Sequence, residues 1–438
     1  MDYEATLRYL DEVQARGIKL GLETINGLMA RMGDPQKAFP AVVVAGTNGK
    51  GSVCAFLASI LKAAGHRAGL YTSPHLVRYE ERIAIDGIPI TATEFADAVT
   101  VVRDHVDRLL AEGGLPSHPT HFELLTAAAF HHFRERGIEV GVLEVGMGGR
   151  LDAVAVARTV VAVITNVTLE HTRYLGSTVE EIAREKAGII REGCWVVTAE
   201  TRPEVLGVIR REAAGRGVRL IERHTDALVS PAPGASSGRF GLSTRQASYG
   251  ELMVPLAGRH QVENATLAVL AAEALGEATG LQIPTRAIVE GLARVHWPGR
   301  LQVAGSAPLL LLDGAHNPAG CEALARALRD MRGGGAFEKL HLVFGVLQDK
   351  DLEPMARHLF PLASRVLLTK GRSERFRDPL EVAAVARSMG IEAQVIPDLR
   401  AALAAAREAC APDDAICLTG SLYLVGDALE AMGLDPYR

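Results

Sequence analysis

A glycine-rich segment with one lysine, GTNGKGS, occupies residues 46–52. The apolar run AVVVA precedes it and the pattern VCAFLASILKAAG follows it, so the segment joins a predicted buried strand to a predicted helix. Glycines allow backbone N–H groups to point inward, the helix N-terminus adds partial positive charge, and a lysine reaches outer phosphates. This pattern predicts a phosphate-binding loop in which Lys50 contacts the terminal phosphates. The alternative is a glycine-rich turn with a solvated lysine.

The loop departs from the usual pattern G-x-x-x-x-G-K-[ST] at two positions. Val44 stands where the first glycine is expected, and Gly51 stands where a hydroxyl residue is expected. Ser52 supplies a hydroxyl one residue later. The strand before the loop and the helix after it nevertheless match the setting that a phosphate cradle needs.

Acidic and imidazole side chains follow two further predicted strands. Glu144 ends the apolar run VGVLE, and His171 comes shortly after the run TVVAVITNV. In doubly wound sheets the carboxyl ends of the strands form the edge where ligands bind. A carboxylate is a natural ligand of Mg²⁺, whereas a histidine is not, because magnesium prefers oxygen donors. Taken alone, His171 is therefore more typical of a loop histidine than of a metal ligand.

Two other segments have both a structural and a functional interpretation. Lys186 lies in the predicted helix after Ser177 and Thr178, where solvated charged residues are the usual case. A buried lysine with a lowered pKa could instead react with CO₂ to form a carbamate. The segment DGAHNP at residues 313–318 follows an apolar run and starts a helix. It is either a helix cap or a nucleotide contact.

These residues need a scaffold, and the sequence predicts one. Apolar, strand-like runs alternate with helical patterns up to residue 199. Two helix starts carry capping boxes, Thr91 with Glu94 and Thr120 with Glu123. The alternation predicts an α/β fold with a mostly parallel sheet covered on both faces. Residues 229–250 are rich in Pro, Gly and Ser and predict a surface loop or a hairpin.

At 438 residues the chain exceeds a usual single domain. A proline and a glycine follow the end of a helical pattern in HWPGR, residues 296–300, and a new series of strands begins there. We therefore predict one domain at residues 1–297, with the phosphate loop, and a smaller doubly wound α/β domain at residues 298–438. The active site is expected in the cleft between the two.

Composition excludes several classes of protein. Forty-seven basic and 52 acidic side chains give a net charge of −5, without a basic run dense enough to bind nucleic acid. The N-terminal segment lacks the apolar core of a signal peptide, and no run of about 18 apolar residues occurs. The five cysteines contain no C-x-x-C pair, so we expect them to be reduced. These features predict a soluble cytoplasmic protein with neither nucleic acid nor a membrane as partner.

The chain carries short motifs in this order: LGLE, GTNGKGS, TSPHLVRYEERI, EVGMGGRLDA, HTRYLG, EKAGI, GRHQVENA, HWPGRL and DGAHNP. Together they resemble the folylpolyglutamate synthase and dihydrofolate synthase family of the Mur ligase superfamily. The resemblance implies a P-loop, Mur-ligase-like ATPase domain that also binds a pterin, followed by a Rossmann-like glutamate ligase domain. It also implies an enzyme that uses ATP and Mg²⁺.

The resemblance assigns site residues by position. Lys186, in EKAGI, matches a lysine that the family carries as a carbamate. The carbamate would supply an oxygen ligand to a second metal. The resemblance therefore reverses the interpretation of Lys186 as a solvated helix residue. The implied catalytic residues are Lys50, His171 and Lys186, and the implied magnesium ligands are Ser73, Glu144 and His171. A monovalent cation is a further candidate cofactor. The implied ATP-binding residues are Gly46, Thr47, Asn48, Gly49, Lys50, Gly51, Ser52, Asn264, Arg300, Asp313 and His316.

Shorter motifs provide the candidate pterin contacts. Two residues depart from the family pattern: Glu170 stands where an aspartate usually precedes the histidine, and Lys19 stands in a segment that often carries an acid. The pterin contacts that the resemblance implies are Ile18, Leu20, Gly21, Thr120, His121, Phe122, Leu151, Asp152 and Ala153.

The expected reaction fits these parts. A carboxylate is a poor electrophile, so ATP first phosphorylates it while Lys50 and the metals neutralise charge on the phosphoryl oxygens. The amine of L-glutamate then attacks the acyl phosphate, and domain closure shields this anhydride from water. The segments LGLE and THFE resemble those of bifunctional bacterial enzymes, so the expected acceptors are dihydropteroate and reduced folates. The expected state is a monomer.

Three alternatives compete with this interpretation. A Mur-type peptidoglycan ligase shares the chemistry but needs a further N-terminal domain, and only 45 residues precede Gly46. A P-loop switch that changes partners with nucleotide would not need a second α/β domain carrying DGAHNP. An enzyme with folylpolyglutamate synthase activity alone is the third. Dependence of nucleotide turnover on pterin and glutamate separates these classes.

Overall fold

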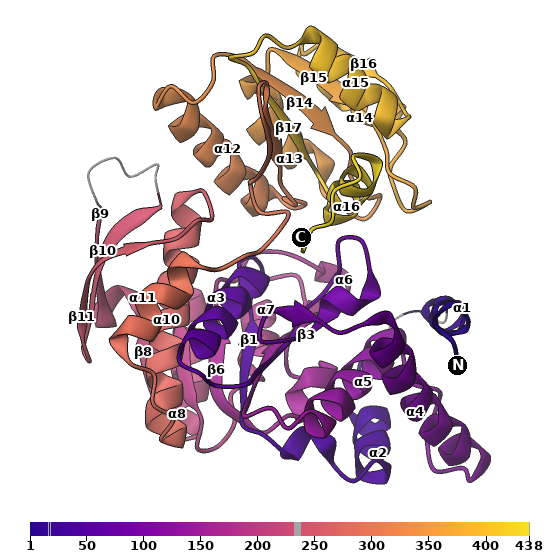
Figure 1. The fold of residues 1–438 in the computed structure, drawn as a ribbon, viewed down its shortest axis with the longest axis vertical. Coiled ribbons are helices and arrows are strands. Elements are labelled where there is room, and N and C mark those ends of the chain that lie inside the picture. The colour runs from indigo at the N-terminus through magenta and orange to yellow at the C-terminus, as the bar shows by residue number, and fades with distance from the viewer. Residues whose placement is uncertain (16, 18, 232–237, 438) are drawn as a thin grey trace.

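The computed structural model describes residues 1–15, 17, 19–231 and 238–437 of the chain. Two α/β units stand one above the other in Figure 1, the larger below and the smaller above. An eight-stranded sheet forms the centre of the larger unit, and a six-stranded sheet forms the centre of the smaller one. The predicted α/β class is therefore confirmed. Within the described residues no helix combines the length and the apolar character needed to cross a membrane.

The eight-stranded sheet has the order β4-β3-β2-β5-β1-β6-β7-β8. Its strands are parallel from β2 through to β8, whereas β3 and β4 form an antiparallel hairpin at one edge. The strands are β1 (Ala41–Ala45), β2 (Ala68–Tyr71), β3 (Ile83–Ile85), β4 (Ile88–Pro89), β5 (Val140–Glu144), β6 (Thr159–Ile164), β7 (Trp195–Thr198) and β8 (Arg219–Glu222).

Both faces of this sheet are buried, as a parallel sheet requires. In β1, Ala41, Val43 and Ala45 point into one apolar core, and Val42 and Val44 point into the other. The first core is shared with α1 (Tyr3–Gln14), α2 (Glu23–Arg31), α4 (Ala92–Ala111), α5 (His121–Glu135), α7 (Val179–Ala187) and α8 (Pro203–Gly215). The second core is shared with α3 (Lys50–Ala63), α10 (Arg259–Thr279) and α11 (Thr285–Ala293).

A small antiparallel sheet lies beside α10 and α11 (Figure 1). Its strands are β9 (Ala227–Pro231), β10 (Arg239–Thr244) and β11 (Ser248–Met253), in the order β11-β10-β9. Phe240, Leu242 and Leu252 bury their side chains in the second core. The predicted loop or hairpin at residues 229–250 is thus a three-stranded sheet with an apolar face, and residues 232–237 lie outside the described part.

The six-stranded sheet has the order β12-β13-β17-β14-β15-β16, and only the β12–β13 pair is antiparallel. Helices cover both of its faces, as the two apolar cores show. The elements are β12 (Gln302–Ser306), β13 (Leu309–Leu312), α12 (Pro318–Gly333), β14 (Leu340–Phe344), α13 (Leu352–Leu359), β15 (Arg365–Leu368), α14 (Pro379–Ser388), β16 (Ala393–Val395), α15 (Leu399–Ala409), β17 (Ala415–Thr419) and α16 (Leu422–Ala431).

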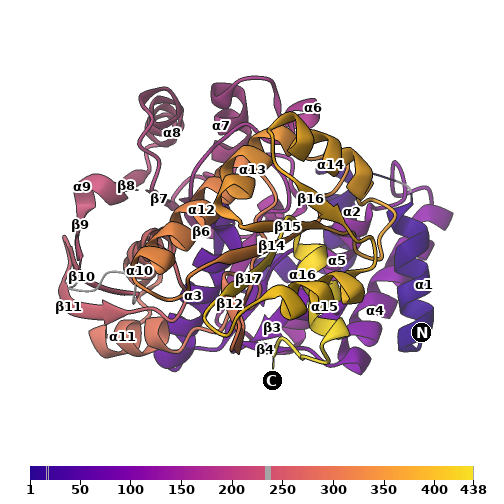
Figure 2. The same cartoon turned by 90° about the horizontal axis from the view of Figure 1, so that it is seen from above.

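Several polar contacts join the two units, which overlap when seen from above (Figure 2). The guanidinium of Arg78 in the larger unit pairs with the carboxylate of Asp435 at 3.2 Å. His296 Nε2 lies 2.6 Å from the carbonyl oxygen of Pro436. The smaller unit therefore stands over the carboxyl edge of the larger sheet, the edge where ligands bind in this class of fold.

Local sequence explains where the helices begin near this edge. Both predicted capping boxes form: the Thr91 hydroxyl accepts from Glu94 N, and the Thr120 hydroxyl accepts from Glu123 N. The helix α3 starts directly after Gly49, whose φ of 86° is unfavourable for other residues. Thr120 thus fixes the start of α5, and Gly49 fixes the start of α3.

Candidate active site

The phosphate loop connects β1 to α3 in a conformation that needs its glycines. A Cβ atom on Gly46 would lie 1.8 Å from Thr165 Oγ1, and one on Gly49 would lie 2.4 Å from Asn264 Oδ1. The Thr165 hydroxyl donates to the carbonyl of Asn48 at 2.7 Å and so holds the loop from below. The close backbone packing leaves the N–H groups at the start of α3 free to face an anion.

The lysine of the loop folds back over it. Lys50 Nζ donates to the carbonyl oxygens of Gly46 and Thr47, both at 3.1 Å. Its ammonium group therefore lies at the mouth of the loop, beside the N-terminus of α3 where the helix dipole is positive. This geometry disfavours the alternative of a glycine-rich turn with a solvated lysine, because two backbone carbonyls hold the ammonium group in place.

The departure at Gly51 has a steric explanation. A Cβ atom there would lie 3.0 Å from Cζ2 of Trp297 and 3.5 Å from Oε2 of Glu144. The indole ring and the carboxylate thus occupy the space that the side chain of a serine or threonine would need. Trp297 belongs to the HWPGR segment, so the connection between the two units packs directly on the phosphate loop.

Glu144 and Ser73 lie next to each other at the carboxyl edge of the sheet. Ser73 N donates to Glu144 Oε2 at 3.0 Å. Burial raises the pKa of the Glu144 carboxyl, while the charge of Lys50 acts in the opposite direction. A buried carboxylate with a hydroxyl residue beside it supplies oxygen donors of the kind that Mg²⁺ prefers.

Lys186 is buried, which contradicts its interpretation as a solvated residue of a helix start. The side chain is 2% exposed, and Nζ donates to Glu170 Oε1 at 2.6 Å and to the Gly46 carbonyl at 2.8 Å. Burial lowers the pKa of Lys186 to about 8, although the charge of Glu170 acts in the opposite direction. Burial also raises the pKa of Glu170, but the charges of Lys186 and Lys50 and the hydrogen bond from Lys186 together outweigh this effect and lower the pKa to about 2. His171, the next residue, precedes α6 (Thr172–Leu175) with a φ of 47°.

The smaller unit supplies the opposite wall. The side-chain amides of Asn48 and Asn317 form a reciprocal pair across the two units, at 2.9 and 3.2 Å. Asp313 accepts from Leu301 N and Ala315 N, both at 2.8 Å, so its carboxylate orders the turn before α12. Asn317 provides the helix cap by accepting from Gly320 N. The helix-cap interpretation of DGAHNP is thus correct for Asn317, whereas Asp313 faces the cavity with both oxygens engaged.

His316 presents one ring nitrogen to the same cavity. Its Nδ1 lies 2.8 Å from the Gly314 carbonyl, and since a carbonyl only accepts, Nδ1 carries the hydrogen. Burial lowers the pKa of His316 to about 4, which leaves the imidazole neutral at pH 7 with Nε2 as an acceptor.

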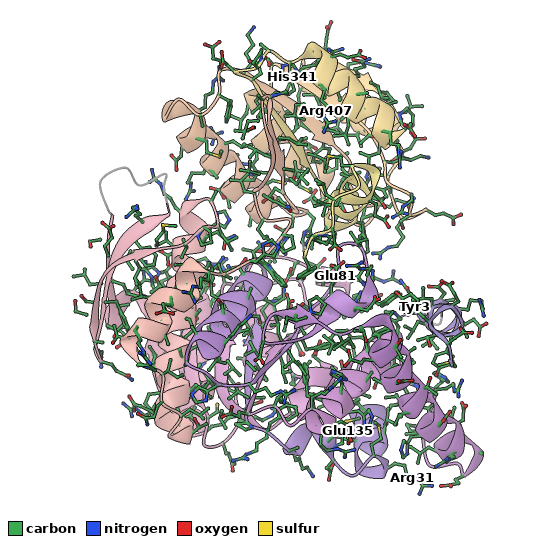
Figure 3. All side chains as sticks on the ribbon, in the orientation of Figure 1. Tyr3, Arg31, Glu81, Glu135, His341 and Arg407 are labelled. Atoms are coloured by element: carbon green, nitrogen blue, oxygen red, sulfur yellow. The ribbon has the colours of Figure 1, made fainter. Side chains whose placement is uncertain are left out.

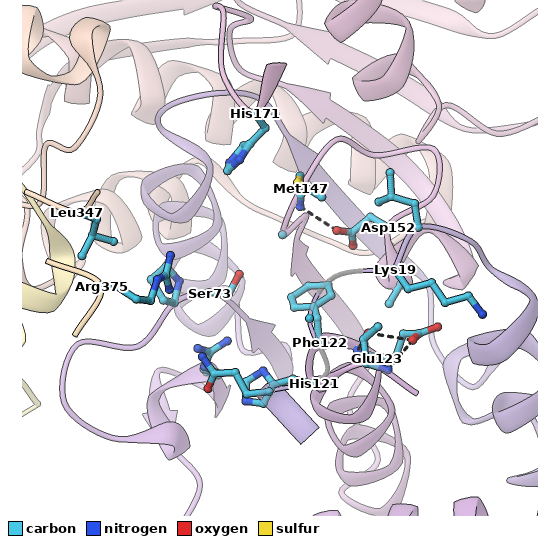
Figure 4. A pocket seen from close by; sticks show the side chains of 18 of the residues that line it. Lys19, Ser73, His121, Phe122, Glu123, Met147, Asp152, His171, Leu347 and Arg375 are labelled. Carbon is cyan, nitrogen blue, oxygen red and sulfur yellow. Dashed lines mark hydrogen bonds between the residues drawn. The ribbon is translucent and has the colours of Figure 1, made fainter. Parts of the chain in front are cut away.

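Two adjoining cavities meet at these residues. One has a volume of about 380 Å³ and is lined by the phosphate loop together with Glu144, Asn264, Arg300, Asp313 and His316. The other has a volume of about 580 Å³, and Figure 4 shows side chains that line it. Residues common to both linings are Ser73, Pro74, Gly146, His171, His316 and Leu422. A ligand in one cavity can therefore touch a ligand in the other.

The second cavity is lined by most of the predicted pterin contacts. Asp152 accepts from Met147 N at 2.9 Å and from Val154 N at 3.0 Å, and burial raises its pKa to about 6. His121 Nε2 lies 3.2 Å from the hydroxyl of Tyr79, and burial lowers its pKa to about 4. The predicted residues in this lining are Leu20, Gly21, Thr120, His121, Phe122, Leu151, Asp152 and Ala153. Ile18 lies outside the described residues.

Cationic side chains in the same cavity were not predicted. Arg82 donates from Nε to His75 Nδ1 at 2.9 Å and belongs to the motif TSPHLVRYEERI, in which only Ser73 was predicted as a site residue. Lys350 and Arg375 come from loops of the smaller unit and carry no sequence signal. Lys19, one of the family departures, donates to Ser117 Oγ at 2.8 Å. These four cations suit an acceptor with several carboxylates.

Among the predicted catalytic, ATP-binding and metal-binding residues, Gly46 and Lys186 do not line the cavity of the phosphate loop; they contact each other through the hydrogen bond from Lys186 Nζ to the Gly46 carbonyl. The other predicted ATP-binding residues and the predicted metal ligands line that cavity. Their chemical roles stay predictions, because a position in a lining does not show what a side chain binds.

The two glycines that flank α3 provide a matched test of the loop. Gly49 and Gly65 have φ values of 86° and 85°, but a Cβ atom on Gly65 would have no neighbour within 4 Å. Alanine at either position costs roughly 1 kcal/mol of unfolding free energy. We expect only Gly49→Ala to raise the KM for ATP as well, by about tenfold or more, because its Cβ displaces the Asn264 amide. Equal KM values for the two variants would contradict a role of the loop in binding ATP.

The fold and the cavities define the class of protein, and comparisons agree with it. Residues 44–272 match the family model of the Mur ligase middle domain, and residues 299–422 match that of the Mur ligase glutamate ligase domain. This chain is therefore a member of the Mur ligase superfamily.

More specific relatives narrow the class. The dihydrofolate synthase/folylpolyglutamate synthase of Bacillus subtilis is 39% identical over 353 residues, which cover 80% of this chain and 81% of that protein. The Mycobacterium tuberculosis folylpolyglutamate synthase complexed with ADP and AMPPCP has a TM-score of 0.90 and 32% identity, over 99% of this chain and all of that one. Escherichia coli FolC in complex with DHPP and ADP has a TM-score of 0.86 and 30% identity, over 99% and 98% of the two chains. The chain belongs to the dihydrofolate synthase/folylpolyglutamate synthase family.

Proposed function

We propose that this protein joins L-glutamate to the carboxylate of dihydropteroate and of folates, with ATP cleaved to ADP and phosphate. The junction of the two cavities at Ser73, His171 and His316 carries this proposal. A nucleotide in the phosphate-loop cavity would direct its terminal phosphate toward an acceptor carboxylate in the other. The similar Escherichia coli protein FolC is known in complex with both DHPP and ADP. This complex supports the assignment of one cavity to the nucleotide and the other to the acceptor.

Residues of this protein can be assigned to most steps of the proposed ligase reaction. Lys50 and the N–H groups of the phosphate loop would hold the phosphates, and the phosphoryl group moves from ATP to the acceptor carboxylate. The α-amine of glutamate then attacks the acyl carbon and expels phosphate, and the amine loses its proton. Phe122 and Asp152 suit a flat heterocycle with N–H groups, while Arg82 and Arg375 suit the carboxylates of the acceptor or of glutamate.

Magnesium fits the donors at the phosphate loop. Ser73 and Glu144 offer oxygen atoms, and the carboxylate of Glu144 is buried and accepts a hydrogen bond from Ser73 N. His171 is a less typical ligand because its donor is nitrogen. When bound, Mg²⁺ would neutralise charge on the phosphates. A second Mg²⁺ and a monovalent cation remain part of the proposal.

A carbamate on Lys186 is also part of the proposal. Its formation adds CO₂ to the neutral amine and releases one proton. With a pKa of about 8, roughly one tenth of Lys186 is neutral at pH 7, far more than of an ordinary lysine. In the amine form, Lys186 is instead paired with Glu170, the residue that departs from the family pattern. The two states therefore compete for the same amine.

We further propose the division into residues 1–297 and 298–438. Separate apolar cores support it, because the two cores of the larger unit and the two of the smaller unit draw on different strands. Closure of the two units around the cleft would exclude water from the acyl phosphate. A monomer stays a prediction, which sedimentation equilibrium would check.

ADP release from the purified protein tests the function directly. The assay contains Mg²⁺, ATP and glutamate, with dihydropteroate, tetrahydrofolate or no pterin. We expect release that requires a pterin and occurs with both acceptors. Release with tetrahydrofolate alone would establish the folylpolyglutamate synthase alternative. Release that is indifferent to both pterins would overturn the proposal in favour of another Mur-type ligase or a nucleotide switch.

A further inference from the structure

Three side chains with different donor atoms converge at the outer end of the smaller unit, where Figure 3 labels His341. His341 is the second residue of β14, Cys410 follows α15, and Asp414 directly precedes β17. One ring nitrogen, the sulfur and one carboxylate oxygen lie within 4.8 Å of one another. The group lies at the amino ends of β14 and β17, whereas Leu347 and Leu422 of the active-site cavity follow the carboxyl ends of the same strands.

The imidazole of His341 makes no hydrogen bond of acceptable geometry within the described residues. The residue is 5% exposed, and both ring nitrogens are buried. Burying a polar group without a partner is unfavourable, so such a group normally has a hydrogen-bond partner, an ordered water molecule or a bound ion. His341 Nε2 lies 3.4 Å from Asp414 Oδ2. Two atoms bound to one tetrahedral zinc by bonds of about 2.0–2.1 Å are about 3.3 Å apart, which is close to this separation.

The backbone holds the carboxylate in position. Asp414 Oδ1 accepts from Lys339 N and Oδ2 accepts from Ala411 N, both at 3.1 Å. The bond from Lys339 ties the segment between α15 and β17 to the residue before β14, and the bond from Ala411 lies within that segment. Each oxygen keeps a second lone pair for another ligand. The carboxylate is thus oriented before any ion binds, which favours a preformed site.

Cys410 completes the set. It is the partly exposed cysteine, whereas Cys54, Cys194, Cys321 and Cys417 are buried. Its sulfur lies within 4.8 Å of the donor atoms of His341 and Asp414.

We propose that His341, Cys410 and Asp414 bind one Zn²⁺ ion, with a water molecule in the fourth position on the exposed side. Nitrogen, sulfur and oxygen donors together suit zinc and exclude magnesium, which prefers oxygen alone. The ion would fasten the segment 410–414 to β14. Since the site is remote from both cavities, its role is structural and does not depend on the ligase reaction.

Cobalt provides a spectroscopic test on the untagged, full-length protein. After treatment with a chelator, Co²⁺ is added, and we expect a thiolate-to-cobalt charge-transfer band that saturates at one equivalent and disappears when Zn²⁺ is added. Cys410→Ser and His341→Gln should each lose the band. Matched controls are Cys194→Ser, a buried cysteine elsewhere, and His224→Gln, an exposed histidine. Both controls should keep it.

Two outcomes would overturn the proposal. The absence of the band in the wild-type protein would leave His341 and Asp414 as an ion pair without a metal. A band that persists in Cys410→Ser would assign the cobalt to another thiol. Circular dichroism of the conservative Cys410→Ser variant shows whether it folds, so that loss of the band reports on the ligand. The ligand set of the phosphate loop contains no thiol, so metal bound there cannot produce this signal.

Discussion

Lys50→Ala is expected to lower kcat for ADP formation by roughly 10³-fold, because one fixed positive charge at a transferring phosphoryl group has an effect of about this size. In the structure the ammonium group of Lys50 lies at the mouth of the phosphate loop, held by the carbonyls of Gly46 and Thr47. Alanine removes the charge without changing the backbone of α3. Steady-state ADP release with saturating pterin and glutamate measures the effect.

A matched control lies on the same helix. Lys62 is exposed near the C-terminal end of α3, so Lys62→Ala removes an equal charge from the same element. We expect its kcat to stay within about twofold of the wild-type value, as for most exposed substitutions. If Lys50→Ala were also within tenfold of wild type, Lys50 would have no role at the phosphates. Equilibrium binding of ADP then separates lost affinity from lost catalysis.

The elements near the phosphate loop could be predicted because their signals are local. A glycine with positive φ begins α3, and the capping boxes of α4 and α5 lie within four residues of each helix start. The convergence of distant motifs was also predictable. Parallel strands place their carboxyl ends on one edge, so Glu144 at the end of β5 and His171 after β6 had to approach the loop after β1.

Burial and contacts between units could not be predicted in this way. The sequence around Lys186 is that of a solvated helix, and only the packing of α7 beneath the phosphate loop buries the amine. Lys350 and Arg375 reach the larger cavity because the smaller unit stands over it, and no local pattern encodes that arrangement. The third strand and the burial of the sheet β9–β11 were not predicted, for a related reason, although a hairpin in this segment was one of the two predicted structures. Its turn residues were visible, but its apolar face is defined by contact with α10 and α11.

Lys186→Ala is expected to lower kcat by roughly 10²-fold or more if the residue acts as a carbamate, and formate or acetate should restore part of the rate. A small carboxylate can enter the space of the lost side chain and supply the missing oxygen donors. A purely cationic role predicts a different pattern. The amine would then act by pairing with Glu170 and Gly46 O, and an added anion would meet the unpaired Glu170 carboxylate and give no recovery.

Two further variants separate these roles. Arg184 is exposed on the same helix, so Arg184→Ala should keep the wild-type rate and show no response to carboxylates. Lys186→Arg keeps the positive charge but cannot form a carbamate, so an active Lys186→Arg enzyme would exclude the carbamate. The pH dependence of reactivation of the wild-type enzyme provides an independent test of the carbamate. Because the neutral fraction of Lys186 rises from about one tenth at pH 7 to about one half at pH 8, enzyme depleted of CO₂ should recover faster with bicarbonate at pH 8.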